Sequence, residues 1–284
     1  MKPNNTFTSL KPEFWANVKL LNQRLGYFER KSKKNKNPDF VIPSIDQIKD
    51  VFDKEGLNYS KLVQSDTLTD FGKTLIDYLT YRKDALNKQV EPNLMDVKTA
   101  KAQFKKLKIM LKPNCPLPMN KQKGKKKDNA FFTCIINMLI EANSDGKPCN
   151  YDPLELTAIT VDKFPVRTLS RRVDGAFPSV INPVAIWEIK EYYYTTTFGS
   201  RVADGVYETL LDGFELKEAE KNIHRKVKHY LMVDDHFTWW TLGRSYLCRI
   251  IDILHMGFID EALFGKEVVS QVPILVKEWI RDLK

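Results

Sequence analysis

Asp174, Glu188 and Lys190 combine the residue types and the spacing that metal-assisted chemistry on a phosphate requires. Two prolines bracket the turn Ser179–Asn182, and a simple antiparallel hairpin about this turn is centred near residue 181. Residues whose numbers sum to about 362 then face each other, which places Asp174 opposite Glu188. Lys190 shares the face of Glu188 because side chains alternate along a strand.

Two carboxylates that face each other in a sheet repel, so this pair predicts a positive charge between them. Oxygen-only ligands suit Mg²⁺ or Mn²⁺, which also bind the phosphate oxygens of a substrate. A metal ion held in this way lowers the pKa of a bound water and stabilises charge on a phosphate under attack. Lys190 would orient the attacking water or stabilise the developing negative charge. These groups are the equipment for phosphodiester hydrolysis.

The Glu-x-Lys spacing alone is a weak signal, because the chain repeats it. Glu215–Lys217 has the same spacing, and Asp96–Lys98 and Asp282–Lys284 are aspartate variants, all three in helical or polar contexts. Only Glu188–Lys190 ends an apolar strand and has an upstream aspartate at a facing position. From the pattern alone, an edge strand with an exposed ion pair remains an equal alternative.

The elements that must position these side chains follow from hydrophobic periodicity and turn residues. The sequence predicts a helix, three strands, a second helix, a fourth strand and two further helices, at Asn129–Ala142, Leu156–Val161, Ser170–Phe177, Val184–Tyr194, Val202–Ile223, Lys228–Val233, about Leu242–Met256 and Val268–Leu283. Three consecutive strands indicate an α+β or mixed α/β fold rather than strict alternation.

A helix with a late Glu141, then Asp174, thirteen residues and Glu188-Ile189-Lys190 together resemble the PD-(D/E)xK nuclease superfamily, which includes many type II restriction endonucleases and resolvases. The resemblance covers about residues 129–235 and implies a restriction-endonuclease-like core of helix, three strands, helix and strand. It implies Asp174 and Glu188 as metal ligands, Glu141 as a further metal-binding carboxylate and Lys190 as the catalytic lysine. Val173 stands where the superfamily motif has proline.

The charge distribution divides the chain. Residues 1–130 hold 27 Lys and Arg against 14 Asp and Glu, a net +13, whereas residues 131–284 hold 18 against 22, a net −4. We therefore expect a basic, mostly helical DNA-binding region at 1–120, a Lys-rich linker at 121–128 and a nuclease domain at 129–284. Short helices at Ser44–Glu55 and Asn58–Val63 permit a helix-turn-helix, although a generic helical bundle fits equally well.

Basic and polar side chains near these motifs are candidates for DNA contacts. Lys123, Lys125, Lys126 and Lys127 would form a phosphate-contacting arm, unless the segment is a solvated hinge. Three more candidates lie in the proposed nuclease domain. Arg172 is expected on the face of Asp174, and Ser200 and Arg201 are expected where the long helix begins.

The resemblance implies a Mg²⁺-dependent DNA endonuclease, of a restriction or other defence type, that acts as a homodimer on double-stranded DNA. Two alternatives stay open: a non-catalytic DNA-binding protein with a nuclease-like core, and a structure-specific or RNA nuclease. The sequence contains no run of about 18 apolar residues, so it predicts no transmembrane helix. The start of the chain lacks the apolar stretch of a secretory signal, and four scattered cysteines show no CxxC pair, so we expect a cytoplasmic protein.

Overall fold

A computed structural model describes residues 1–29, 38–194, 199–223 and 225–283 of the chain. The chain forms two compact units. The smaller comprises Asn4–Gln89, and the larger comprises Val90–Lys284 together with Met1–Pro3. Each unit has its own core and is described by itself.

The smaller unit is mostly helical, as the sequence predicted. It consists of α1 (Asn5–Thr8), α2 (Pro12–Leu25), α3 (Ile45–Lys54), the strands β1 (Val63–Gln64) and β2 (Thr67–Leu68), α4 (Asp70–Ala85) and the π-helical turn η1 (Leu86–Val90). Ser44 begins α3 with a capping box, in which its hydroxyl accepts from Gln47 N at 3.2 Å. The second short helix predicted at 58–63 is wrong, because this segment forms turns that lead into the β1–β2 hairpin.

The larger unit contains the remaining elements. They are η2 (Glu91–Asn93), α5 (Val97–Leu111), η3 (Gly124–Lys126), α6 (Phe131–Asn143), β3 (Asn150–Tyr151), β4 (Ala158–Val161), β5 (Phe164–Thr168), β6 (Gly175–Phe177), β7 (Ala185–Glu191), α7 (Ser200–Glu220), β8 (Lys228–Asp234), η4 (Phe237–Leu242), α8 (Arg244–His255), β9 (Glu261–Phe264) and α9 (Glu267–Asp282).

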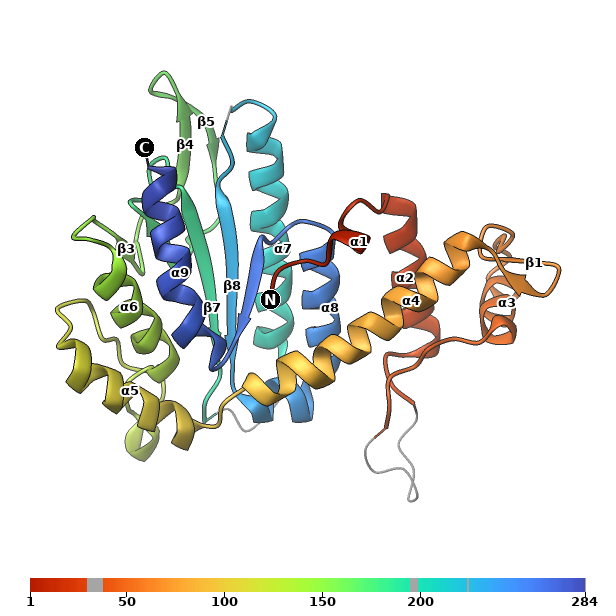
Figure 1. Cartoon of the computed structure of the whole chain (residues 1–284), viewed down its shortest axis with the longest axis horizontal. Coiled ribbons are helices and arrows are strands. Elements are labelled where there is room, and N and C mark those ends of the chain that lie inside the picture. The colour runs from red at the N-terminus through yellow and green to blue at the C-terminus, as the bar shows by residue number, and fades with distance from the viewer. Residues whose placement is uncertain (30–37, 195–198, 224, 284) are drawn as a thin grey trace. The chain divides into compact units, whose positions relative to one another are not determined.

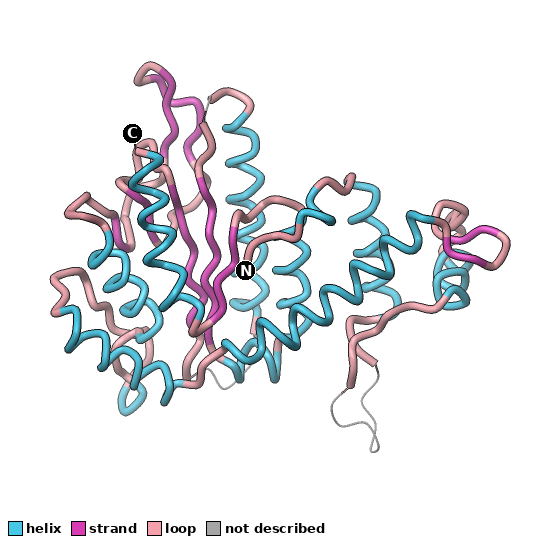
Figure 2. The backbone as a smooth tube through the Cα atoms, in the orientation of Figure 1, coloured by secondary structure: helices cyan, strands magenta, loops and turns pink. Residues whose placement is uncertain are grey.

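A five-stranded mixed sheet lies at the centre of the larger unit, in the order β3-β6-β7-β8-β9 (Figure 1). β6 pairs antiparallel with both β3 and β7, whereas β7–β8 and β8–β9 are parallel. The strands β4 and β5 form a separate hairpin beyond this sheet (Figure 2). The fold is therefore mixed α+β, as expected.

Helices cover both faces of this sheet. α5, α6 and α9 pack on the face that carries Trp187, whose ring stacks on that of Trp279 with centroids 5.4 Å apart. α7 covers the opposite face, where Leu216 packs with Ile186, and α8 lies beside α7 and β9. Each face of β7 thus meets a different helical layer.

The boundary predicted at residues 121–128 is wrong, because these residues lie inside the larger unit. The helices on either side of them share one core, with the rings of Phe104 and Phe131 5.5 Å apart. Ala130 N also donates to Pro118 O at 2.9 Å, which closes the segment into a loop. The chain divides between residues 89 and 90 instead, so residues 90–130, with eleven lysines against three acidic residues, bring their net +8 to the larger unit.

The predicted strands differ from the observed ones in several places. The two-residue β3 was missed, and the strand predicted at Leu156–Val161 is β4, which lies outside the five-stranded sheet. β5 was missed, since Pro165 interrupts its pattern. β6 begins only at Gly175, so residues 170–174 precede the strand. β9 has just four residues between two predicted helices and was also missed. None of the described helices is long and apolar enough to cross a membrane.

Candidate active site

Asp174 and Glu188 lie opposite each other at the start of β6, as the sequence predicted. The observed register pairs Gly175 with Trp187, so the preceding residue on one strand meets the following residue on the other. Asp174 N donates to Glu188 Oε1 at 3.3 Å, and Ile189 N donates to Asp174 Oδ2 at 2.7 Å. The two carboxylates are therefore brought together by the backbone pairing itself.

Gly175 makes this register possible. A Cβ atom at this position would lie 2.1 Å from the ring of Trp187 on the neighbouring strand. The same ring also stacks on that of Trp279, with an interplanar angle of 8°. Only glycine leaves room for the ring, and the ring then fixes the strands that carry Asp174 and Glu188.

Lys190 lies on the face of β7 that α7 covers. Its Nζ donates to Glu188 Oε2 at 2.8 Å and to Glu208 Oε2 at 3.3 Å, and only 9% of its side chain is exposed. Gly205 of α7 permits this position, because a Cβ atom there would lie 3.1 Å from Lys190 Cδ. The structure therefore brings the three predicted catalytic residues together.

Arg171 joins the same carboxylates, although the sequence predicted Arg172 in this place. Arg171 Nη1 lies 2.9 Å from Glu188 Oε1, and its Nη2 lies 3.0 Å from Glu188 Oε2. Arg172 is exposed instead. The prediction failed because residues 170–174 are not strand, so the alternation of side chains that it assumed does not apply.

Two carboxylates of α7 complete the group. Arg171 donates to Asp212 Oδ2 at 2.6 Å and to Glu208 Oε2 at 3.4 Å. Neither Asp212 nor Glu208 was assigned to the site from the sequence. The signal was the spacing of four residues, which places both on one helix face, and the buried Leu216, which continues that face. We call Arg171, Asp174, Glu188, Lys190, Glu208 and Asp212 the β7–α7 cluster.

The pKa values of Asp174 and Glu188 are shifted in opposite directions. Burial would raise the pKa of Glu188, but the positive charges of Lys190 and Arg171 outweigh it and lower this pKa below its usual value. Burial and the negative charge of Glu188 raise the pKa of Asp174 to about 6. Burial would lower the pKa of Lys190, but Glu188 and Asp174 raise it above its ordinary value, so the ammonium stays charged.

The carboxylate oxygens of the cluster suit Mg²⁺, which keeps several water ligands, better than they suit a metal ion that is bound by protein groups alone. Among the described residues, no three His, Cys, Asp or Glu side chains converge to hold a metal ion alone. Mg²⁺, however, is usually bound by one or two carboxylates together with waters and substrate phosphates. Asp174 and Glu188 supply two carboxylates. Asp212 Oδ1 is also buried without a hydrogen-bond partner in the described part of the chain, although Asp212 does not join the other two in a three-ligand group.

Glu141 does not belong to this site, which corrects the expectation that it binds the metal. Its carboxylate accepts a hydrogen bond from Asn114 N at 3.0 Å. The helix α6 that carries it packs in the core on the Trp187 face of β7. Glu188 and Lys190 project from the opposite face, so the sheet separates them from Glu141.

The predicted phosphate-contacting lysines lie on a strongly basic segment, residues 97–127. It holds eleven lysines and no Asp or Glu, and Lys123, Lys125, Lys126 and Lys127 are all exposed. We call residues 97–127 the lysine segment. Within its described residues, Lys101 is the one lysine that forms an ion pair, with Asp128. The segment leads into α6, whose Thr133 N donates to Glu191 Oε2 at 3.0 Å at the end of β7. The lysines therefore precede α6, and a hydrogen bond joins α6 to β7, the strand that carries Glu188.

The other predicted DNA contacts are at the start of α7. Ser200 is the first residue of this helix and is exposed. Arg201 follows it in the first turn, and its side chain lies outside the described part of the structure. Neither is placed in the β7–α7 cluster.

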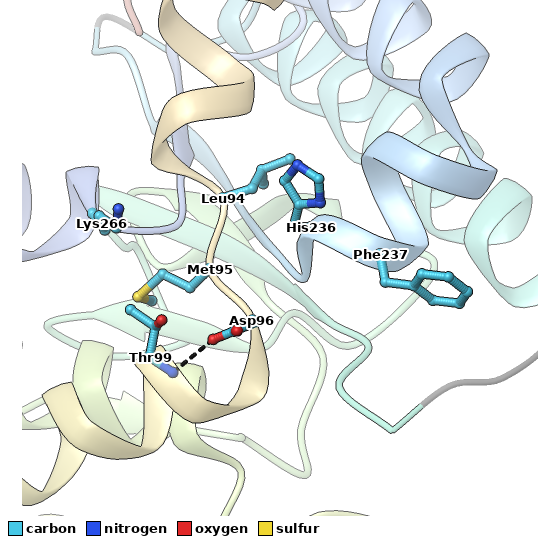
Figure 3. A pocket seen from close by; sticks show the side chains of 7 residues that line it. All are labelled: Leu94, Met95, Asp96, Thr99, His236, Phe237 and Lys266. Carbon is cyan, nitrogen blue, oxygen red and sulfur yellow. Dashed lines mark hydrogen bonds between the residues drawn. The ribbon is translucent and has the colours of Figure 1, made fainter. Parts of the chain in front are cut away.

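A separate pocket lies beside the start of α5, and none of the predicted site residues lines it (Figure 3). Its polar lining includes Asp96, His236 and Lys266. Asp96 caps α5 by accepting from Thr99 N at 2.7 Å, and His236 lies 3.6 Å from Glu91. These groups have structural partners, so the pocket is a weaker candidate than the cluster.

Two family models match the chain. Residues 95–279 match one described as Domain of unknown function (DUF7687), and residues 1–89 match one described as Domain of unknown function (DUF7690). The two matched ranges divide near the boundary between the compact units. No curated protein and no solved structure matches the chain. Every residue of the β7–α7 cluster lies in the first matched range.

Proposed function

This chain belongs to the DUF7687 family, and we propose that it is a Mg²⁺-dependent endonuclease that hydrolyses phosphodiester bonds of double-stranded DNA. One observation carries the proposal. Asp174 and Glu188 face each other from adjacent strands, and Lys190 Nζ lies 2.8 Å from Glu188 Oε2. A carboxylate pair beside a buried ammonium is an arrangement that costs folding energy, which makes it a candidate for function.

Each of the three residues has a role in this reaction. Asp174 and Glu188 would bind the metal ion, and Mn²⁺ can replace Mg²⁺ on the same oxygen ligands. The metal ion supplies a positive charge that lowers the pKa of water and stabilises the phosphate under attack. Lys190 remains charged at neutral pH, so it can donate a hydrogen bond to the attacking water or to a phosphate oxygen.

The order of elements supports the same proposal. β3, β6 and β7 form three antiparallel strands after α6, and α7 crosses over to the parallel β8. This is the order of helix, three strands, helix and strand of a restriction-endonuclease-like core. Two features depart from the PD-(D/E)xK pattern: Val173 replaces the motif proline, and Glu141 lies across the sheet from the site.

The lysine segment supports a polyanionic substrate. Its charge exceeds that of the smaller unit, which has 15 Lys and Arg against 11 Asp and Glu, a net +4. Exposed lysines bind DNA through its phosphates, and each contact adds about 0.9 to the slope of log K against log salt. We expect Lys125→Gln, Lys126→Gln and Lys127→Gln together to weaken DNA binding and reduce this slope.

The matched control for the lysine segment lies in the smaller unit. Lys11, Lys19 and Lys54 are exposed there, and their replacement by glutamine removes the same charge. A larger loss of affinity from this control than from the change at residues 125–127 would return DNA binding to the N-terminal region, where the sequence first placed it.

An inactive nuclease-like core that only binds DNA is the second candidate. It is favoured by the contacts of Glu188. Its Oε2 already accepts hydrogen bonds from Arg171 and Lys190, and its Oε1 accepts one from Asp174 N and forms an ion pair with Arg171. Such a protein would bind DNA through the lysine segment without cutting it. Cleavage assays separate the two candidates, and RNA and branched DNA included as substrates test for an RNA or structure-specific nuclease.

The test of the proposed function is cleavage of supercoiled plasmid by wild type and by Lys190→Met, in Mg²⁺ and in EDTA. We expect Mg²⁺-dependent cutting that falls about 10³-fold in the variant. Lys217→Met is the matched control, because Glu215–Lys217 has the same spacing outside the cluster and Lys217 donates to Met256 O at 2.8 Å. Equal cutting by all three proteins, or none by wild type, would contradict the proposal.

We further propose that the enzyme acts in the cytoplasm as a homodimer of a restriction or defence type. Two active sites related by a two-fold axis can cut the two antiparallel strands of a duplex. Sedimentation equilibrium with and without DNA tests the dimer, and a monomer that makes double-strand breaks in a single binding event would contradict it.

A further inference from the structure

Glu188 is the most fully engaged carboxylate of the cluster. A carboxylate has about four lone-pair sites. Oε1 of Glu188 faces Arg171 Nη1 at 2.9 Å and Asp174 N at 3.3 Å, and Oε2 accepts from Arg171 Nη2 at 3.0 Å and Lys190 Nζ at 2.8 Å. Each oxygen thus already meets two donors. A metal ion can bind Glu188 only where one of these donors leaves.

Arg171 is the donor that can leave. The Asp174 N–H belongs to the backbone between paired strands, and the Lys190 side chain is 9% exposed and packs over Gly205. The Arg171 side chain is 22% exposed and comes from residues that precede β6 rather than from a strand. Its movement therefore disturbs the least structure.

Arg171 also has other partners that would retain it. Its Nη1 lies 2.6 Å from Asp212 Oδ2 and its Nη2 lies 3.4 Å from Glu208 Oε2, both on α7. A guanidinium released from Glu188 would stay within the site, held by these two carboxylates. Its freed N–H groups would then be available to bind phosphate oxygens, which a guanidinium can do in a bidentate manner.

We propose that Arg171 is an internal counter-cation of the metal site. It neutralises Glu188 when no metal ion is bound. When a metal ion binds Glu188, Arg171 leaves Glu188 and stays in the site through its ion pairs with Asp212 and Glu208. This inference rests on the proposed function, since it assigns the metal to Glu188. The charge count agrees with it. When all four carboxylates are ionised, they exceed the positive charges of Arg171 and Lys190 by two, which one divalent cation balances.

The exchange makes Arg171 a competitor of the metal ion, which yields a test independent of cleavage. We would measure Mn²⁺ binding without DNA, from the free Mn²⁺ signal in electron paramagnetic resonance, for wild type, Arg171→Gln and Arg171→Lys. We expect Arg171→Gln to bind Mn²⁺ about tenfold more tightly than wild type, and Arg171→Lys to lie between them. Arg172→Gln removes an adjacent exposed charge and is the matched control, with an affinity close to that of wild type.

A second measurement covers a loss of stability in Arg171→Gln. Mn²⁺ raises the Tm of a protein that binds it only when folded, and the rise should be larger in this variant than in wild type. Arg171→Lys retains a charge and carries the same comparison if the glutamine variant does not fold.

The outcomes separate this inference from the proposed function. Wild-type binding of Mn²⁺ with equal or weaker binding by both Arg171 variants would overturn the counter-cation and leave the nuclease intact. Absence of Mn²⁺ binding in every protein would overturn both. Binding by Arg171→Gln alone would support the counter-cation, because Arg171 would then block the site in the free chain.

Discussion

Glu188 and Glu191 lie three residues apart on β7, on opposite faces of the same strand, and the pKa values of their carboxyl groups are shifted in opposite directions. Arg171 and Lys190 surround Glu188 and keep its pKa below the usual value despite its burial. Glu191 accepts hydrogen bonds from Thr133 N and Oγ1, both at 3.0 Å, and burial raises its pKa to about 7. Desolvation without nearby cations thus raises the pKa of a carboxyl group, whereas cations placed around a buried carboxyl group lower its pKa.

The two faces of β7 differ in the same way. On one face, Trp187 stacks on Trp279 and contributes to the core of α5, α6 and α9. On the other, the β7–α7 cluster places charges where a core would be more stable, since buried ion pairs recover little of their desolvation cost. The apolar face therefore stabilises the fold, and we infer that the charged face serves the reaction.

The largest effect should come from a pair of glycines, one on each side of this comparison. Gly175→Ala drives a methyl group into the Trp187 ring and should lower the free energy of unfolding by about 3 kcal/mol. Gly205→Ala presses on the stem of Lys190, so stability should change by no more than about 1 kcal/mol while cleavage falls about tenfold. Urea denaturation and plasmid cleavage measure both. Equal stability losses would show that the faces do not divide stability from activity.

A smaller effect is expected from replacing each of the two glutamates by glutamine, which should change the free energy of unfolding at pH 8 in opposite directions. Glu188→Gln removes a buried counter-charge that Arg171 and Lys190 both contact and should lower the free energy of unfolding by about 2 kcal/mol. At pH 8 Glu191 is ionised although burial raises its folded pKa to about 7, which costs the folded chain stability, so Glu191→Gln should raise this free energy by about 1 kcal/mol. Both are read from urea denaturation. Changes of the same sign in the two variants would sink the comparison.

The smallest effect is the pH dependence that Glu191 contributes. Its folded pKa of about 7 exceeds the ordinary value of 4.5, so the folded chain binds its proton more tightly than the unfolded chain. The stability from this group is complete below pH 4.5 and is lost as the pH rises through 7. Glu191→Gln should flatten the fall between these pH values. An unchanged pH profile would mean that Glu191 is ionised in the folded chain.

The sequence predicted the heart of the site because local rules govern it. Two prolines fixed the turn between β6 and β7, and strand alternation then placed Asp174, Glu188 and Lys190 correctly. Arg172 was predicted in place of Arg171 because both residues lie three to four positions before β6 begins, where alternation no longer holds. A rule that depends on pairing is reliable only as far as the pairing extends.

Predictions that needed tertiary packing failed. Glu141 has the right type on the right helix, but the face of the sheet on which α6 packs is not written in its own sequence. The lysine segment shows the same limit, since its charge marked an exposed loop that was taken for a domain boundary. Asp212 was missed because a carboxylate on a buried helix face has meaning only beside Arg171.

The most direct test of the account compares Mg²⁺-dependent plasmid cleavage by wild type, Asp174→Asn and Glu191→Gln. Asp174 lies in the cluster, whereas Glu191 is an equally perturbed carboxyl group across the sheet. The account predicts that Asp174→Asn loses cleavage about 10³-fold while Glu191→Gln cuts within a few-fold of wild type. Loss of cleavage in Glu191→Gln with retention in Asp174→Asn would place the chemistry on the other face of β7 and contradict the account.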